Sequence, residues 1–160
     1  MSILGIKNKS DSTPLPLSGI RIVDFGWMIA GPLATRILAD FGAEVIRIES
    51  TARVDEIRIL GPRPEGTKSP NVAGVFNDCN VSKLSITVDL STTRGIDVVK
   101  QLISLSDIVT DNFRGDRMGI WGLDYQNLKE LKPDIIMLSM PMMGSTGPHQ
   151  HYGGNGINII

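Results

Sequence analysis

The chain has 160 residues, of which 41% are hydrophobic and 21% are charged, and its formal net charge is −1. This composition is enough for one globular core, and the lack of any basic block argues against a nucleic-acid partner. A single cysteine, Cys79, excludes an internal disulfide framework and is typical of a reducing cytoplasm. No apolar run approaches the roughly 20 residues that a membrane span needs. We therefore expect a cytoplasmic protein that binds neither nucleic acid nor membrane.

The two ends of the chain differ in character from its middle. Residues 1–16 lack the apolar core of a signal peptide and predict a flexible lead-in. The last residues, Gly156–Ile160, rise in hydrophobicity without a cap or a polar tail, which is unusual for a natural domain end. We therefore expect residues 17–160 to be one domain that is truncated, with a second domain absent from the chain.

The stretch from residue 20 to residue 49 predicts a strand, a turn, a helix and a second strand. A short apolar run ends at Asp24, and Gly31 and Pro32 are expected to open the helix, where a proline needs no N–H. Gly42 is expected to end the helix, and residues 43–48 form the second strand. The apolar residues that recur at helical spacing are Leu33, Ile37, Leu38 and Phe41.

Strands and helices continue to alternate after this unit. Residues 50–80 are expected to form a functional loop or to carry short helical turns. Three more strands are expected: a half-buried strand over 84–90, a strand over 107–110, and a strand over 135–138 that is buried on both faces. A helix capped by Ser91 or Thr92 is expected between the first two of these strands. Between the last two, we expect a helical turn over 116–122 with Met118 and Trp121 inward and a helix from 123 through Leu131 with Leu128 and Leu131 inward, and a glycine-rich loop over 141–156 is expected to follow the last strand. The apolar stripe of the helix after Thr92 is expected to be Ile96, Val98, Val99, Leu102, Ile103 and Leu105.

This alternation predicts a Rossmann-like α/β fold with a mainly parallel sheet and flanking helices. Two parallel strands joined by a helix form a right-handed unit, and such sheets bind ligands at the turn from strand to helix. One alternative function is an NAD(P)-binding oxidoreductase of Rossmann type, because Glu49 closes the second strand where an acid would meet a ribose. However, Met28 occupies the place of the second glycine that a G-x-G-x-x-G turn needs. A further alternative is that Trp27 and Met28 only fill the core.

Four motifs of this sequence occur together in one known family. They are the opening stretch of residues 16–49, the segment Asn80–Leu90 (NVSKLSITVDL), the block from Asp111 to Tyr125 with its DNFR and WGLDY ends, and the loop Gly144–Pro148 (GSTGP). In this order and spacing they resemble the class III CoA-transferases, the carnitine- and bile-acid-inducible (CaiB/BaiF) group. The resemblance covers residues 16–156.

The resemblance implies a Rossmann-like domain that binds coenzyme A, within longer chains that pass through each other in pairs like interlocked rings. It assigns the CoA contacts to two segments, namely Trp27, Met28, Ile29, Ala30 and Gly31 in the turn, and Asn112, Phe113 and Arg114 after a later strand. A free backbone amide in the turn, with a helix N-terminus behind it, would also suit a phosphate. Arg114 could bind a phosphate bidentately, or it is a solvated surface arginine.

The resemblance also implies transfer of CoA between an acyl-CoA and a carboxylic acid. In the family an aspartate attacks the thioester and a mixed anhydride forms. The CoA thiolate then attacks to give an aspartyl-CoA thioester, a form of nucleophilic catalysis. That aspartate would fall at Gly156, and no Asp or Glu follows Asp134 in this chain. Some members of the family carry a basic residue at the position that corresponds to Ile120 in this chain. The glycine-rich loop, with Gly144, Gly147 and Gly154, is expected near the active site, where its N–H groups can stabilise an oxyanion.

These departures leave three interpretations. The chain is an Asp-lacking subunit of a heteromer beside a catalytic partner, or another group acts as the nucleophile, or the chain has lost activity and is a fragment or a non-enzymatic assembly partner. In each case the resemblance implies an interlocked homo- or heterodimer with a similar chain. No metal is expected, because His149 and His151 are too few ligands. We expect Cys79 to be an unreactive thiol, and Met137, Met140, Met142 and Met143 to pack a strand end rather than to bind a cofactor.

Overall fold

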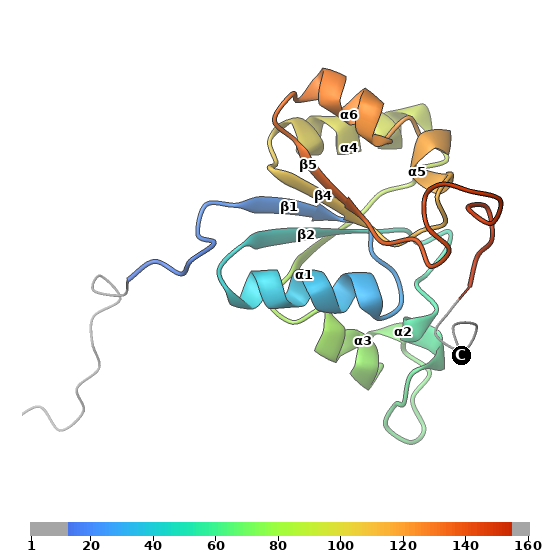
Figure 1. The fold of residues 1–160 in the computed structure, drawn as a ribbon. Helices are drawn as coiled ribbons and strands as arrows, with labels where there is room; N and C mark the ends of the chain where they lie inside the picture. Colours follow the sequence, from blue (N-terminus) through green and yellow to red (C-terminus); the bar gives the residue numbers. More distant parts are fainter. Residues whose placement is uncertain (1–12, 155–160) are drawn as a thin grey trace, which may run out of the picture.

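The computed structural model describes residues 13–154, so most of the expected lead-in and the expectations for Gly156 lie outside the described residues. The sheet has five strands in the order β3-β2-β1-β4-β5, and every neighbouring pair is parallel (Figure 1). The strands are β1 (Arg21–Asp24), β2 (Glu44–Glu49), β3 (Leu84–Thr87), β4 (Ile108–Asp111) and β5 (Ile136–Ser139). The helices are α1 (Ala30–Asp40), α2 (Ile57–Leu60), the 3-10 turn η1 (Pro70–Val72), α3 (Gly74–Cys79), α4 (Thr93–Ser104), α5 (Arg117–Ile120) and α6 (Tyr125–Leu131). The predicted parallel α/β fold is confirmed.

Local sequence signals explain where these elements begin and end. The Thr92 hydroxyl accepts a hydrogen bond from the Gly95 N–H at 3.0 Å, so Thr92 is the cap of α4. Gly42 ends α1 as predicted, because its φ of +104° and its approach to Leu15 exclude a side chain. Helix α1 begins at Ala30, two residues before Pro32, so the expected helix start was late. Short helices fill the segment between β2 and β3, as expected.

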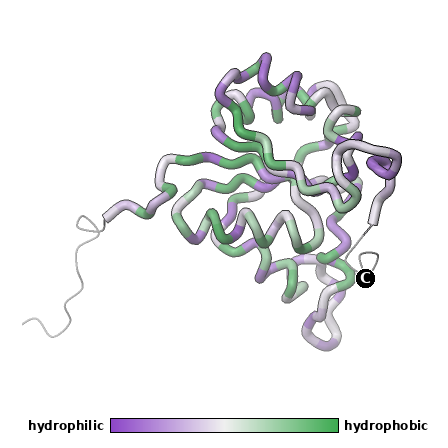
Figure 2. Tube along the Cα trace, in the orientation of Figure 1, coloured by the Kyte–Doolittle hydropathy of each residue, from purple (hydrophilic) through white to green (hydrophobic). Residues whose placement is uncertain are grey.

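The core lies on both sides of the central strand β1. Val23 and Phe25 pack with Val99 and Ile103 of α4 and with Leu128 of α6 on one side. On the other side, buried residues of α1 and β2 enclose the side chain of Ile22. In Figure 1, α1 lies on one side of the sheet, and α4 and α6 lie on the other. Figure 2 shows that hydrophobic residues concentrate in the central strands and in α1.

Several apolar residues that were predicted from the sequence to be buried are exposed to solvent. Strand β5 is an edge strand rather than a doubly buried one, and its Ile136 is 60% exposed. No strand among residues 13–154 pairs with the outer edge of β5. The prediction that β5 is buried on both faces, which rested on its continuous apolar run, was therefore wrong. Leu131, Val98 and Leu105 were also wrongly expected to face the core, and β3 is a shorter, more exposed edge strand than predicted.

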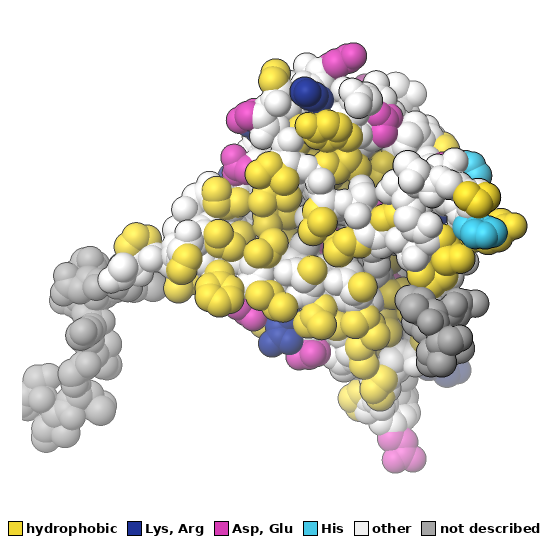
Figure 3. Space-filling view, in the orientation of Figure 1, with side chains coloured by type: hydrophobic (Ala, Val, Ile, Leu, Met, Phe, Trp, Pro, Cys, Tyr) yellow, Lys and Arg dark blue, Asp and Glu magenta, His cyan; other side chains and the backbone are white. Residues whose placement is uncertain are grey.

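The apolar face of α1 is exposed as well. Leu33, Ile37 and Phe41 are all exposed, whereas Thr35 and Ala39 face the sheet. Figure 3 shows hydrophobic side chains gathered over this side of the molecule. We define the exposed residues Leu33, Ile37, Phe41, Ile136 and Leu138 as the apolar patch. No helix among residues 13–154 is long and apolar enough to cross a membrane.

Two isoleucines provide a matched test of this packing. Ile103 is 0% exposed and Ile37 is 49% exposed. The substitution Ile103→Ala is expected to lower the free energy of unfolding by about 2–5 kcal/mol, because it leaves a cavity in the core. The substitution Ile37→Ala is expected to change it by about 0.5 kcal/mol or less. Urea denaturation of the two variants checks this difference, and equal losses would contradict the packing described.

Candidate functional site

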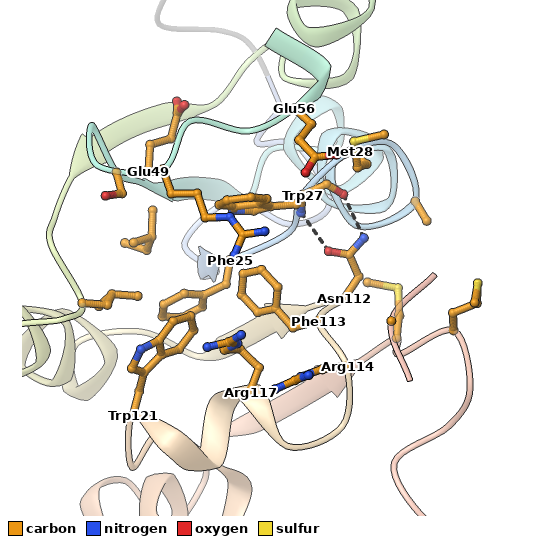
Figure 4. A pocket seen from close by; sticks show the side chains of 18 of the residues that line it. Phe25, Trp27, Met28, Glu49, Glu56, Asn112, Phe113, Arg114, Arg117 and Trp121 are labelled. Atoms are coloured by element: carbon orange, nitrogen blue, oxygen red, sulfur yellow. Dashed lines mark hydrogen bonds between the residues drawn. The ribbon is translucent and has the colours of Figure 1, made fainter. Parts of the chain in front are cut away.

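The turn from β1 into α1, residues 26–31, is held by hydrogen bonds to three side chains from different parts of the chain. The Asp24 carboxylate accepts a hydrogen bond from the Gly26 N–H at 2.7 Å. The Asn112 side chain accepts from the Trp27 N–H at 2.8 Å and donates to the Trp27 carbonyl at 2.8 Å (Figure 4). The Asp55 carboxylate accepts from the Met28 N–H at 3.2 Å. Residues 26–28 therefore have no N–H left for a phosphate, and only later residues of the turn could offer one.

Met28 adopts a backbone conformation that is costly for a residue with a side chain. Its φ is +60°, in the left-handed region, and its side chain packs beside Ile57 and Phe76. The carboxylate that holds its N–H is itself held by Arg47, whose guanidinium donates to Asp55. Arg47 and Asp55 are 1% and 3% exposed, so this is a buried ion pair directly behind the turn.

A second buried ion pair lies under the same turn. The Lys83 ammonium donates to Asp24 at 3.0 Å, to the Pro32 carbonyl at 2.8 Å and to Asn80 at 3.0 Å. Burial lowers the pKa of Lys83, although the Asp24 carboxylate opposes this shift. The hydroxyls of Thr35 and Thr110 also donate to Asp24. This network fixes the first turn of α1 relative to the sheet.

A cavity of about 1060 Å³ opens beside the turn at the carboxyl ends of the strands. This is where parallel sheets place their ligands, and the strand order reverses here between β1 and β4. Of the residues predicted to contact CoA, seven lie on its wall, namely Trp27, Met28, Ile29, Ala30, Asn112, Phe113 and Arg114. Gly31 does not lie on the wall, but a side chain there would meet the Asn112 amide at 3.1 Å, so its small size permits the turn to reach Asn112.

The glycine-rich loop is only partly at the cavity. Gly154 lies on the wall together with Tyr152, Gly153, Met140 and Met142. Gly144 and Gly147 are not on the wall, and both have positive φ values that shape the loop. The loop folds back on the segment after β4, where the Gly115 N–H donates to the Gln150 carbonyl at 3.1 Å. Met140 and Met142 therefore line the cavity instead of only packing a strand end.

Three aromatic rings form a continuous row along the cavity wall. The ring centroids of Trp27 and Phe113 are 5.8 Å apart, and those of Phe113 and Trp121 are 5.6 Å apart, both edge to face. The Arg53 guanidinium lies 5.3 Å from the Trp27 ring, and the Arg117 guanidinium lies 5.6 Å from the Trp121 ring. We call these three rings the aromatic row. Arg114 differs from Arg53 and Arg117, because it forms an ion pair with Asp116 at 2.8 Å.

Glu49, the residue that suggested a dinucleotide, has both carboxylate oxygens engaged by the protein. One oxygen accepts from Arg58 at 2.8 Å, and the other accepts from Arg58 and from Ser85, also at 2.8 Å. Burial alone would raise the pKa of Glu49, but these hydrogen bonds and the charge of Arg47 hold it below its ordinary value. A carboxylate bound in this way does not favour recognition of a ribose.

Asp111, at the end of β4, is a buried carboxyl group. It accepts hydrogen bonds from the Ser139 hydroxyl at 2.6 Å and the Phe113 N–H at 3.1 Å. Burial raises its pKa, and these two hydrogen bonds only partly oppose the shift.

A raised pKa of Asp111 predicts a specific pH dependence of stability. The folded state favours the protonated acid, so this contribution to stability is complete below the unfolded pKa of about 3.9 and is lost as the pH rises through the folded pKa. The stability of the wild type relative to Asp111→Asn is therefore expected to fall as the pH rises from about 4. Urea denaturation of both proteins across the pH range checks this, and a constant difference would refute it.

The remaining candidates are Cys79, His149 and His151, and among the described residues they do not form a catalytic or metal-binding arrangement. Cys79 is buried, and burial followed by the negative charge of Asp78 raises the pKa of its thiol, in line with an unreactive group. His149 stacks against Tyr152, and His151 lies 3.5 Å from Asp116. Within residues 13–154, no group of three or more metal-ligating side chains comes together.

Sequence reasoning missed the residues that hold the site in place. Arg47 interrupts the apolar run of β2, and a lone arginine in a buried strand indicates a buried partner, but its partner Asp55 lies in a loop. Lys83 belongs to a motif that the sequence had singled out, yet its contact with Asp24 crosses 59 positions. Arg53 and Arg117 carried no sequence signal.

Comparisons with known proteins identify the family. Residues 17–160 match CoA-transferase family III. A succinate–glutarate CoA-transferase of Agrobacterium fabrum is 38% identical over 87% of this chain and 35% of its own length. The alpha and beta subunits of a succinyl-CoA–L-malate CoA-transferase of Chloroflexus aurantiacus are 37% and 35% identical over 88% and 89% of this chain, and over 30% and 34% of their own lengths.

The fold comparison agrees with the sequence comparison. The crystal structure of a CaiB/BaiF family protein from Brucella suis superposes with a TM-score of 0.80 at 36% identity, over 91% of this chain and 38% of that one. The chain thus spans about a third of the length of these relatives. The resemblance noted in the sequence is confirmed, and the nicotinamide alternative is not favoured. The chain belongs to CoA-transferase family III.

Proposed function

We propose that this chain binds CoA thioesters in the cavity beside the turn of residues 26–31 and takes part in moving CoA between an acyl-CoA and a carboxylic acid. The observation that carries the proposal is the paired hydrogen bonding of Asn112 with Trp27, which joins the two family motifs into one cavity wall. The cavity volume of about 1060 Å³ is at the upper end of the range for small-molecule sites.

The chemistry of the transfer requires a carboxylate nucleophile. Its oxygen attacks the thioester carbonyl, the bond from carbon to sulfur breaks, and the CoA thiolate leaves with a mixed anhydride behind it. The thiolate then attacks the carbonyl carbon that the nucleophile contributed to the anhydride. A CoA thioester of the nucleophile forms, and the acyl group leaves as a free acid. The acceptor acid reverses these steps. The family's nucleophile position falls at Gly156 in this chain, so we propose that the nucleophile comes from a partner chain of the same family.

Two observations support a partner of this kind. The related L-malate CoA-transferase has distinct alpha and beta subunits, both similar to this chain. In addition, the apolar patch leaves Ile37 and Ile136 exposed to water, which is typical of surfaces that associate. We propose that this chain is the Asp-lacking member of an interlocked heterodimer. A cytoplasmic location fits its single, buried, free cysteine.

Acyl exchange tests the proposed division of roles. The chain is incubated with succinyl-CoA and an isotopically labelled dicarboxylic acid, alone and together with a related chain that carries Gly-Tyr-Asp at the family's nucleophile position. We expect label to enter the CoA thioester only in the mixture. Full exchange by this chain alone would overturn the non-catalytic role, and failure of CoA to bind at millimolar concentration would overturn the function itself.

A further inference from the structure

The segment Asn80–Leu90 begins with two polar side chains that do not reach the cavity. Asn80 is the residue at which α3 ends, and Lys83 directly precedes β3. Neither residue lines the cavity, and the Lys83 side chain is only 2% exposed. Ser82, between them, has a φ of +65°, and the tight turn brings the Lys83 ammonium within 3.0 Å of the Asn80 side-chain oxygen. These two residues therefore act through contacts inside the protein.

The side-chain oxygen of Asn80 accepts hydrogen bonds from two buried cations. The Lys83 ammonium donates to it at 3.0 Å, and the Arg47 guanidinium donates to it at 2.9 Å. An amide oxygen has two lone pairs, so one atom can accept both bonds. The amide nitrogen of Asn80 donates to the Phe76 carbonyl at 2.8 Å, which fixes the direction in which the oxygen points. The Asn80 amide is thus a neutral bridge between two ion pairs.

The carboxylate partners of these two cations hold the turn on either side of Trp27. Asp24, the partner of the ammonium, accepts a hydrogen bond from the Gly26 N–H at 2.7 Å. Asp55, the partner of the guanidinium, accepts one from the Met28 N–H at 3.2 Å. A continuous chain of hydrogen bonds and ion pairs therefore runs behind the turn, from the residue before Trp27 to the residue after it, and the bridging amide is its midpoint.

We infer that Asn80 is a positioning residue, which joins the two buried ion pairs into one support and thereby sets the position of Trp27 on the cavity wall. This inference rests on the proposed function and specifies how the turn is prepared for a CoA thioester. Met28 has a φ of +60°, and such a conformation persists only where the surrounding structure enforces it. A turn that is fixed before the ligand arrives loses less conformational entropy on binding, so its affinity is higher.

Substitutions of Asn80 test the support while both ion pairs stay in the protein. Asn80→Leu and Asn80→Ala remove the bridging oxygen, and both are expected to lower the affinity for CoA about tenfold in calorimetric titrations of the full chain. Asn80→Asp keeps an oxygen facing the two cations and is expected to lose less. Val45→Ala is the control for stability, because Val45 is buried in the cluster beneath α1, away from the cavity, and its truncation is expected to leave CoA affinity unchanged.

A second readout reports the turn in the protein without ligand. In a Trp121→Phe background, Trp27 is the only tryptophan, so its emission reports the surroundings of the turn. Asn80→Leu and Asn80→Ala are expected to shift this emission and to make it more accessible to quenching by acrylamide. Val45→Ala is expected to leave both properties near those of the Trp121→Phe protein.

The outcomes separate this inference from the proposed function. The inference alone fails if the variants that lack the bridging oxygen bind CoA as tightly as the wild type, or if the emission and quenching of Trp27 do not change in them. Equal losses of CoA affinity in these variants and in Val45→Ala would also overturn it, because the loss would then follow stability. If CoA does not bind the wild type, the proposed function fails, and the emission of Trp27 still decides whether Asn80 positions the turn.

Discussion

Replacing Asp55 with alanine is expected to lower the free energy of unfolding by about 3–5 kcal/mol, a loss at least comparable to that expected for Ile103→Ala. The substitution would leave the Arg47 guanidinium buried without its carboxylate partner, and it would release the Met28 N–H from its acceptor. The buried guanidinium would keep only its hydrogen bond to Asn80 and the Glu49 carboxylate at 3.8 Å, which do not replace the carboxylate that faces it most closely. Chemical denaturation of Asp55→Ala measures this loss.

The control for this substitution is an ion pair on the surface. Glu44 pairs with Arg21, and both side chains are substantially exposed, so Glu44→Ala is expected to cost about 1 kcal/mol or less. A double variant, Arg47→Met with Asp55→Leu, is expected to recover much of the lost stability, because it removes both buried charges together. If Asp55→Ala were no less stable than Glu44→Ala, the buried pair would not support the turn.

The substitution Asn112→Asp is expected to lower the affinity for CoA at least tenfold, corresponding to a cost of about 1–3 kcal/mol in the turn. The amide of Asn112 donates to the Trp27 carbonyl, and a carboxylate would place a negative charge against that oxygen. Trp27 would then leave its position on the cavity wall. Calorimetric titration with CoA, together with denaturation, separates the loss of binding from the loss of stability.

Asn77→Asp is a suitable control, because Asn77 is exposed on α3 and its amide donates to the Asn71 carbonyl, away from the cavity. It introduces the same charge at a solvated position, so CoA affinity is expected to remain near that of the wild type. Equal CoA affinity in Asn112→Asp and Asn77→Asp would contradict the role of the paired hydrogen bonds.

The sequence predicted the order of strands and helices but not which apolar residues are buried. Helical spacing singled out Leu33, Ile37 and Phe41, yet spacing cannot distinguish a face that packs on the sheet from a face that is left exposed. The same limit applies to β5, because an apolar strand has the same pattern at the edge of a sheet as at its centre. Thr92 and Gly42 were predictable, since caps and turns depend on neighbouring residues.

The candidate site was predictable only in part, because its contacts join distant positions. The resemblance to a family brought the turn and Asn112 into one hypothesis, although the two are 85 residues apart in the chain. The hydrogen bonds behind the turn, from Arg47 and Lys83, depend on side chains that meet only after the sheet has formed. The arginines stacked on the aromatic row depend on ring positions in the same way.

Tryptophan fluorescence offers the most direct test that this cavity is a CoA site. The chain has two tryptophans, Trp27 and Trp121, and both lie on the cavity wall. Titration of the protein with CoA is expected to change their emission in a saturable way, and titration with NADH, corrected for its absorbance, is expected to produce no saturable change. Saturable quenching by NADH, or no saturable response to CoA up to millimolar concentration, would contradict the assignment of this cavity to coenzyme A.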